Sequence, residues 1–320
     1  MQKARKHNIK KIYALPKAFL QTFGGRVHSM CDMRRYTSWR IGGTADWLLE
    51  AGSEADVLAV LDLVAANDIP LTVIGRGTNL LVSDAGIAGI VLRIGAAFDK
   101  IEYLPDNRVK AGAGVLLAAL SRRTAERGLS GLEWACGIPG NLGGALFMNA
   151  GAYGGSMSAI VTEVRFAAYN DAKAKKAVIG TLSGSDLRFD YRSGCVGEGM
   201  VALAATLQLV PGDAALSLAQ IDEIIATRAK NQPLEYPSAG SVFRNPEGAH
   251  AGYLVESSGC KGMRCGGAEV SKKHGNFIIN TGGATANDVL CLIDQVQRVV
   301  QNKTGYALET EVRLLGRDSD

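Results

Sequence analysis

The stretch from Gly137 to Gly155, GIPGNLGGALFMNAGAYGG, constrains the fold more than any other part of the chain. It contains seven glycines and no charged residue. Glycine is used this densely where the backbone approaches a neighbour closely or adopts a positive φ. Backbone N–H groups without side chains in the way can surround a phosphate, and residues 145–149 are expected to form a short helix whose N-terminus faces an anion. The alternative is a glycine-rich turn between two strands, and the stretch alone favours neither.

Composition limits the class of protein. The chain has 320 residues, 47% of them hydrophobic and 21% charged, which is enough for two or three globular domains. A net charge of +4 is too mild to indicate a nucleic-acid-binding protein. The longest apolar runs, such as residues 115–120, are too short to cross a bilayer. No apolar segment follows the basic N-terminus, so we expect no signal peptide.

The cysteines and histidines give no sign of a metal site. None of the six cysteines forms a CxxC pair, and the four histidines lack the spacing of metal ligands. The cysteines lie in apolar or glycine-rich surroundings, so we expect free thiols in a reducing cytoplasm.

A second glycine loop follows a βαβ-like start. A strand is expected at Ala45–Glu50, a helix beginning at Ser53, and a strand at Leu71–Ile74, after which the sequence reads GRGTNLLV. The loop is not a dinucleotide fingerprint, because Leu80 occupies the third glycine position and no helical pattern follows. The chain also lacks the G-x-x-x-x-G-K of a P-loop. The loop nevertheless offers several donors to a phosphate.

The rest of the chain indicates an α+β fold with many short strands. Residues 1 to about 30 are expected to form a basic helical arm, and a domain boundary is expected at Pro211. Further helices are predicted at 216–230 and after Thr285, where Asp288 completes a capping box. The last strand, 308–315, alternates with period two, so its charged residues should face away from Leu308.

Several long strings carry a resemblance to a known family. In chain order they are TSWRIGGTAD, IGRGTNLLVSD, GLEWACGIPGNLGGALFMNAGAYGG, FDYRS, QPLEYPSAGSVFRNP, GGAEVSKKHGNFIIN and LETEVRLLG. They cover about residues 36 to 316, and they resemble the UDP-N-acetylenolpyruvoylglucosamine reductase (MurB) family. The short spacing between Tyr191 and Pro246 is similar to the subclass that lacks a tyrosine-bearing insertion. One departure is Ser193, which lies one position earlier than the serine of the family's Tyr-Arg-x-Ser pattern.

The resemblance implies a domain organisation and an activity. After an N-terminal arm at 1–35, residues 36–211 would bind FAD non-covalently as a two-part domain of the vanillyl-alcohol-oxidase (PCMH) type, divided near residue 95. Residues 217–306 would form the α/β substrate-binding domain, and 307–320 would return to the FAD-binding part. The implied enzyme is a cytoplasmic UDP-N-acetylmuramate dehydrogenase of peptidoglycan synthesis. It uses NADPH to reduce the enolpyruvyl ether of UDP-N-acetylglucosamine, and no protein partner, nucleic acid or membrane is implied.

The resemblance also implies the site residues. Ser241 matches the proton donor, Arg192 the enolate stabiliser and Glu311 the carboxylate beside that centre. Without the family these would be a turn hydroxyl, a surface ion pair and a solvated strand residue. The substrate-binding positions are Tyr191, Lys230 and Asn245. The expected FAD contacts are the residues Gly75, Arg76, Gly77, Thr78, Asn79, Leu80, Gly137, Ile138, Pro139, Gly140, Gly143, Gly144, Asn149, Ala150 and Gly151.

Two other classes of function stay open on sequence grounds. One is a different FAD-dependent oxidoreductase on the same fold, although no motif for covalent flavin attachment lies near either glycine loop. The other is a nucleotide-binding module without catalysis. The presence of Arg192, Ser241 and Glu311 together argues against that module.

Overall fold

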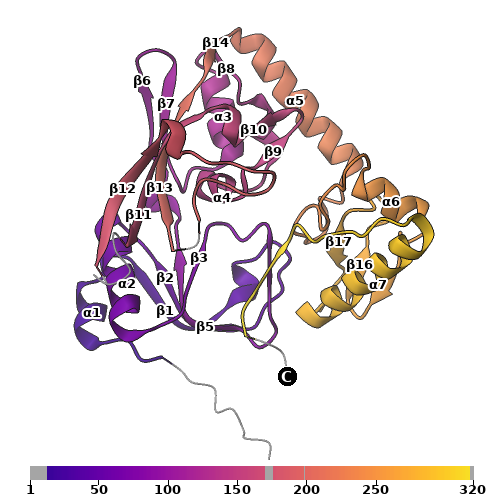
Figure 1. Cartoon of the computed structure of the whole chain (residues 1–320), viewed down its shortest axis with the longest axis horizontal. Helices are drawn as coiled ribbons and strands as arrows, with labels where there is room; N and C mark the ends of the chain where they lie inside the picture. Colours follow the sequence, from indigo (N-terminus) through magenta and orange to yellow (C-terminus); the bar gives the residue numbers. More distant parts are fainter. Residues whose placement is uncertain (1–12, 170–175, 198, 318–320) are drawn as a thin grey trace, which may run out of the picture.

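The computed structural model describes residues 13–169, 176–197 and 199–317. A larger N-terminal part contains the two largest sheets, and a smaller C-terminal part contains a three-stranded sheet and the last long helix (Figure 1). The long helix α5 (Ala214–Asn231) joins the two parts, and the end of the chain runs back from the smaller part to the larger one (Figure 1).

The first sheet of the N-terminal part has the strand order β1-β2-β5-β3. Strand β2 and strand β3 run parallel to β5, and β1 is antiparallel to β2. Ser53 begins helix α2, because its hydroxyl accepts from the backbone N–H of Asp56 at 3.1 Å. The elements are α1 (Lys17–Thr22), β1 (Arg26–Asp32), β2 (Thr44–Glu50), α2 (Glu54–Asn67), β3 (Leu71–Ile74) and β5 (Ile87–Arg93).

The predicted N-terminal helical arm is confirmed at α1, Lys17–Thr22, and is wrong from Arg26 onward. Residues 26–32 form β1, which pairs along its length with β2. Strand β1 lies at the edge of its sheet, and pairing with β2 outweighs any local helical preference. Residues 1–12 of the predicted arm lie outside the described residues.

The second sheet is antiparallel, in the order β12-β11-β13-β7-β6. It shares one hydrophobic core with the first sheet, in which Leu49, Leu92 and Val164 are fully buried. The elements are β6 (Ile101–Leu104), β7 (Arg108–Gly112), α3 (Leu117–Ala125), β8 (Leu129–Ser130), α4 (Leu142–Met148), β9 (Gly151–Ala152), β10 (Gly155–Ser156), β11 (Val161–Tyr169), β12 (Ala177–Ser183), β13 (Val201–Gln208) and β14 (Val210–Pro211).

The C-terminal part packs helices on a small antiparallel sheet, β15-β16-β17. Helix α7 shows both predicted caps: Thr285 and Asp288 form the capping box, and Gly305 ends the helix at φ 78°. The elements after α5 are α6 (Ala251–Ser257), β15 (Arg264–Cys265), β16 (Ala268–Val270), β17 (Ile278–Asn280) and α7 (Ala286–Thr304).

The chain then returns to the N-terminal part. Strand β18 (Arg313–Leu315) pairs in parallel with β4 (Leu80–Val82), a strand that the sequence did not predict. Regular strand covers only these last residues of the predicted 308–315 segment, and the predicted alternation is wrong. Leu314 is 54% exposed, whereas the side chain of Glu311 is only 16% exposed. The pairing partner, not the local period, decides which side chains are covered.

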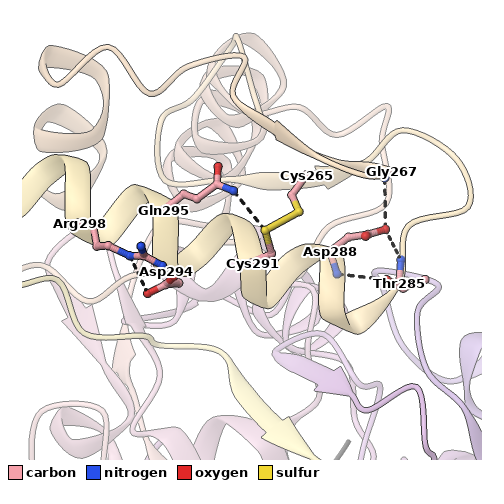
Figure 2. Close-up of a disulfide and its surroundings, with 8 residues drawn as sticks. All are labelled: Cys265, Gly267, Thr285, Asp288, Cys291, Asp294, Gln295 and Arg298. Atoms are coloured by element: carbon pink, nitrogen blue, oxygen red, sulfur yellow. Dashed lines mark hydrogen bonds and ion pairs between the residues drawn. A yellow bond between two sulfur atoms is a disulfide. The ribbon is translucent and has the colours of Figure 1, made fainter. Parts of the chain in front are cut away.

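The prediction of free thiols is also wrong for one pair. Cys265 of β15 and Cys291 of α7 form a disulfide across the C-terminal part (Figure 2). Their Cα atoms are 6.4 Å apart, within the usual range for a disulfide. The other cysteines that the structure describes are free: Cys31, Cys136, Cys195 and Cys260.

Residues 13–169, 176–197 and 199–317 were searched for metal-binding clusters and membrane-spanning helices. No group of three or more His, Cys, Asp or Glu side chains there is placed to hold a metal ion. Across the same residues, no helix combines the length and apolarity needed to cross a membrane.

Candidate active site

The two glycine loops lie against each other. A Cβ added at Gly75 in the first loop would lie 2.8 Å from both Cγ and Nδ2 of Asn141 in the second loop. A Cβ added at Gly140 in the second loop would lie 3.5 Å from Oγ1 of Thr78 in the first. Loops that are far apart in the sequence therefore form one surface, which contains most of the residues expected to contact FAD.

Local structure explains how each loop holds its shape. Gly77 adopts φ 65° and its Cα lies against the carbonyl of Tyr36, so only glycine fits there. In the second loop, the buried Asn141 precedes α4 but does not cap it; its Nδ2 donates to the carbonyl of Ile94 at 3.2 Å. Helix α4 ends at Asn149, which adopts φ 43°. The helix thus begins three residues earlier than the sequence predicted.

The glycines of the second loop fit a bound pyrophosphate. At Gly140 and Gly144 an added Cβ would meet protein atoms only at 3.5 Å, an ordinary contact distance. The protein itself therefore does not require glycine at these positions, and neither residue has a positive φ. A ligand that lies against the backbone would explain both glycines, and exposed Arg76 in the facing loop adds a cation.

Beside these loops, a tight turn presents Arg192. The backbone groups of Asp190 and Ser193 bond to each other in both directions, at 2.8 and 3.1 Å, so Tyr191 and Arg192 form the tip. Arg192 adopts φ 58°, which is unfavourable for a residue with a side chain and requires support. Part of that support comes from Asn149, whose Nδ2 donates to the carbonyl of Asp190 at 2.9 Å. Ser193, the residue that differs from the family pattern, thus contributes its backbone N–H and carbonyl to this turn.

Arg192 forms an ion pair with Glu311. The Nε–Oε1 distance is 2.9 Å, and both side chains are mostly buried. Burial raises the pKa of the Glu311 carboxyl, and the charges of Arg192 and then Arg244 oppose this rise. The backbone of Glu311 is fixed as well, because Asn79 of the first glycine loop donates to its carbonyl at 3.1 Å.

The Ser241 segment pairs with the backbone of Glu311. The N–H of Glu311 donates to the carbonyl of Val242 at 2.7 Å, which places Ser241 one residue from this contact. Ser241 is half-buried, and its hydroxyl has no hydrogen-bond partner among the residues that the structure describes. The fold therefore brings Arg192 and Glu311 into contact and places Ser241 one residue from the Val242–Glu311 hydrogen bond.

The expected substrate-binding residues do not gather around the Arg192–Glu311 pair as a group. Tyr191 is 59% exposed beside Arg192, whose guanidinium lies 5.3 Å from the ring centre. Lys230 is exposed in the last turn of α5. Asn245 uses Oδ1 to accept from the N–H of Ala251 at the start of α6, at 2.9 Å. Only Tyr191 contacts a member of the Arg192–Glu311 pair within the described residues.

Two residues beside the site were given no role at the sequence level. The positive charge of Arg244 opposes the rise in the pKa of the Glu311 carboxyl that burial causes. Nη1 of Arg244 also lies 3.8 Å from Oε2 of Glu309. Buried Asn276 holds the Ser241 segment, since its carbonyl accepts from Val242 at 2.9 Å and its Nδ2 donates to Phe243 at 2.8 Å. Both residues lie in strings that carried the resemblance, but the sequence does not show which atoms an arginine or asparagine will meet.

Comparison with known proteins matches both parts of the chain. Residues 45–176 match a model described as FAD binding domain. Residues 232–315 match a model described as UDP-N-acetylenolpyruvoylglucosamine reductase, C-terminal domain. The matched ranges contain the two glycine loops and the Val242–Glu311 hydrogen bond, respectively.

Whole proteins are similar as well. The UDP-N-acetylenolpyruvoylglucosamine reductase of Heliobacterium modesticaldum is 44% identical over 296 residues, which are 92% of each chain. The reductase of the same name from Synechococcus sp. is 44% identical and covers 91% of this chain and 94% of its own. A crystal structure of the reductase from Thermus caldophilus superposes with a TM-score of 0.77 at 33% identity, covering 91% of this chain and 99% of that one.

Proposed function

The chain belongs to the UDP-N-acetylenolpyruvoylglucosamine reductase family, and from this premise we propose how its residues perform the family's reaction. It is an FAD-dependent oxidoreductase that uses NADPH to reduce UDP-N-acetylglucosamine enolpyruvate to UDP-N-acetylmuramate for peptidoglycan precursor synthesis. The observation that carries the residue assignment is the contact of Arg192, Glu311 and the Ser241 segment beside the glycine loops.

FAD is held without a covalent bond, with its pyrophosphate against the two glycine loops. The open backbone at Gly140 and Gly144 and the donors of Arg76 and Thr78 support this assignment. When bound, reduced flavin supplies the hydride for the substrate's double bond. The remaining chemistry falls to the side chains of this chain.

Arg192 stabilises negative charge on the substrate carboxylate. This charge grows as the double bond is reduced, so a cation fixed beforehand binds the transition state more strongly than the ground state. The ion pair with Glu311 holds the guanidinium in place, and its remaining N–H groups can face the carboxylate. Glu311 thus limits where Arg192 can lie.

Ser241 donates the proton that completes the reduction. A serine hydroxyl is a weak acid, so it needs a nearby group that makes proton loss less costly. Arg192 and Arg244 bring positive charge to this region. The hydroxyl has no partner among the described residues, which leaves it available to a substrate.

Tyr191, Lys230 and Asn245 bind the sugar nucleotide. Lys230 offers a point charge to a phosphate, and Asn245 keeps its Nδ2 donor available because only Oδ1 serves α6. Exposed Tyr191 stands at the tip of the turn that presents Arg192.

The proposed domains follow the same assignment, except that the FAD-binding part begins at residue 26 instead of 36 because β1 belongs to its first sheet. Residues 26–211 bind FAD, 217–306 hold the substrate, and the segment from 307 completes the FAD-binding part. We place the enzyme in the cytoplasm, where both UDP-sugars and NADPH are available, and there it serves cell-wall growth, cell shape and division.

The decisive experiment separates the two half-reactions. Purified protein should be yellow and release FAD on denaturation. Anaerobic NADPH should bleach the flavin, and UDP-N-acetylglucosamine enolpyruvate should then reoxidise it. Ser241→Ala should spare the first step and slow the second, because only the second requires protonation of carbon. Equal slowing of both steps would show that Ser241 has a structural role instead.

A further inference from the structure

Trp39 extends from the N-terminal part into the core of the C-terminal part. It is fully buried and belongs to the same apolar cluster as Phe243 and Val289. Its indole Nε1 donates to the carbonyl of Ile278 in β17 at 2.8 Å. Its own carbonyl accepts from Nδ2 of buried Asn280 at 3.0 Å. Trp39 is therefore fixed to β17 by hydrogen bonds at both its side chain and its backbone.

On its other side, Trp39 is tied to the first glycine loop. The N–H of Ser38 donates to the carbonyl of Gly77 at 3.1 Å. The hydroxyl of Thr37 donates to the carbonyl of Ile41 at 2.8 Å, which closes the short segment around Trp39. The residue that enters the C-terminal core is thus one position away from a direct contact with the loop proposed to hold FAD.

From β17 the connection continues to Ser241. Asn276 lies two residues before Ile278 and binds the backbone of both Val242 and Phe243. Each link from Gly77 to the Ser241 segment is therefore either a hydrogen bond or a few residues of backbone. Such a chain of short contacts leaves little freedom in the position of Ser241 relative to the loop.

The surroundings make this contact more important. A cavity of about 760 Å³ lies between the two parts and is lined by Arg40, Gly42, Asn280 and neighbouring loops. On that side the two parts are separated by open space, so buried contacts elsewhere must set their relative position. The apolar cluster around Trp39 supplies packing, and the Trp39 hydrogen bonds add directional constraints.

We propose that Trp39 is a positioning residue for the reaction: it fixes the Ser241 hydroxyl relative to the flavin-binding loop. The inference rests on the proposed role of Ser241. Losing the indole N–H would leave the carbonyl of buried Ile278 unpaired and loosen the contact. A displacement of about 1 Å at a reacting group can cost roughly 100-fold in rate.

The test compares Trp39→Phe with Trp47→Phe. Trp47 also donates its indole N–H to a backbone carbonyl, that of Tyr13 at 2.5 Å, but within the N-terminal part. Trp39→Phe should keep full FAD content and near-normal flavin reduction by NADPH. Its flavin reoxidation by the enolpyruvyl sugar nucleotide should slow by about tenfold or more, whereas Trp47→Phe should leave both steps unchanged. Equal slowing of both steps in Trp39→Phe, or no slowing, would overturn the proposal.

A double-mutant cycle distinguishes a positioning role for Trp39 from a purely structural one, because it measures whether the effects of Trp39 and Ser241 on reoxidation are coupled. If Trp39 acts through Ser241, Trp39→Phe combined with Ser241→Ala should reoxidise no more slowly than Ser241→Ala alone. Independent, multiplied losses would refute the inference. If Ser241→Ala alone leaves reoxidation intact, the proposed function of Ser241 fails separately. Should Trp39→Phe not fold, benzothienylalanine at position 39 keeps the shape without the N–H donor and must give the same result.

Discussion

Two glycine-to-alanine substitutions should separate what the protein needs from what FAD needs. At Gly75 an added Cβ would lie 2.8 Å from Cγ and Nδ2 of Asn141, well inside the ordinary contact distance. Asn141 is 3% exposed and bonds the carbonyl of Ile94, so it cannot move without breaking a buried hydrogen bond. At Gly140 the nearest protein atom to a Cβ is Oγ1 of Thr78, at 3.5 Å.

The magnitudes follow from these contacts. Overpacking at Gly75 costs about 1–3 kcal/mol, and a buried donor left unpaired costs about 1–3 more, together roughly 2–6 kcal/mol. Gly75→Ala should therefore lower the Tm of the apoprotein by about 4 °C or more. Gly140→Ala should change apoprotein stability by no more than about 0.5 kcal/mol. If pyrophosphate occupies the open space there, a similar overpacking of about 1–3 kcal/mol should weaken FAD binding roughly 5- to 150-fold.

Calorimetry of the apoproteins and fluorescence titration with FAD measure the two effects separately. An unchanged Tm in Gly75→Ala would refute the contact between the loops as the reason for that glycine. Unchanged FAD affinity in Gly140→Ala would refute the second loop as the pyrophosphate site without contradicting the dependence of the enzyme on FAD.

Three further predictions concern charge and sulfur. Glu311→Gln should slow flavin reoxidation while substrate still binds, whereas Glu309→Gln, whose side chain is 78% exposed, should be nearly silent; the reverse result would contradict our choice of carboxylate. Burial raises the pKa of Glu311 despite the opposing charge of Arg192, so over a range of pH the native state keeps a proton that the unfolded chain releases. The free energy of unfolding should therefore fall as pH rises from the ordinary glutamate pKa through the raised one. Denaturant titrations should show this slope in wild type and not in Glu311→Gln. Thiol titration of the unfolded protein should find four free thiols without reductant and six with it, and six from the start would refute the disulfide. Because Cys265 and Cys291 are 26 residues apart, reducing their disulfide should lower the free energy of unfolding by about 3–4 kcal/mol.

Local signals in the sequence predicted local structure well. Strand β3 has the predicted bounds, and the caps of α7 at Thr285 and Gly305 are as expected. These features depend on neighbouring residues: a capping hydroxyl with its partner three positions on, or a glycine that ends a helix. The resemblance added the identity of the site residues, and the structure confirms that Arg192 and Glu311 meet.

What the sequence could not give depends on distant partners. Glu311 resembles a solvated residue of an alternating strand, but its side chain is mostly buried beside Arg192, and Asn79 and Val242 bond its backbone. Strand β1 was mistaken for helix because β2, not its own composition, stabilises it. The disulfide likewise requires a proximity of β15 and α7 that no spacing of cysteines reveals.

The parallel pairing of β18 with β4 has a consequence for how the enzyme forms during synthesis. Asn79 and Glu311, which bond across this junction, are 232 residues apart in the chain. Ribosomes add about 5–20 residues per second, so the first glycine loop waits about 12 to 46 seconds for its partner. During that wait β4 presents an unpaired edge, which is a site for mispairing with other chains. Glu311 also bonds the carbonyl of Val242 in the C-terminal part, so its carboxylate is among the last components of the candidate site to be synthesised.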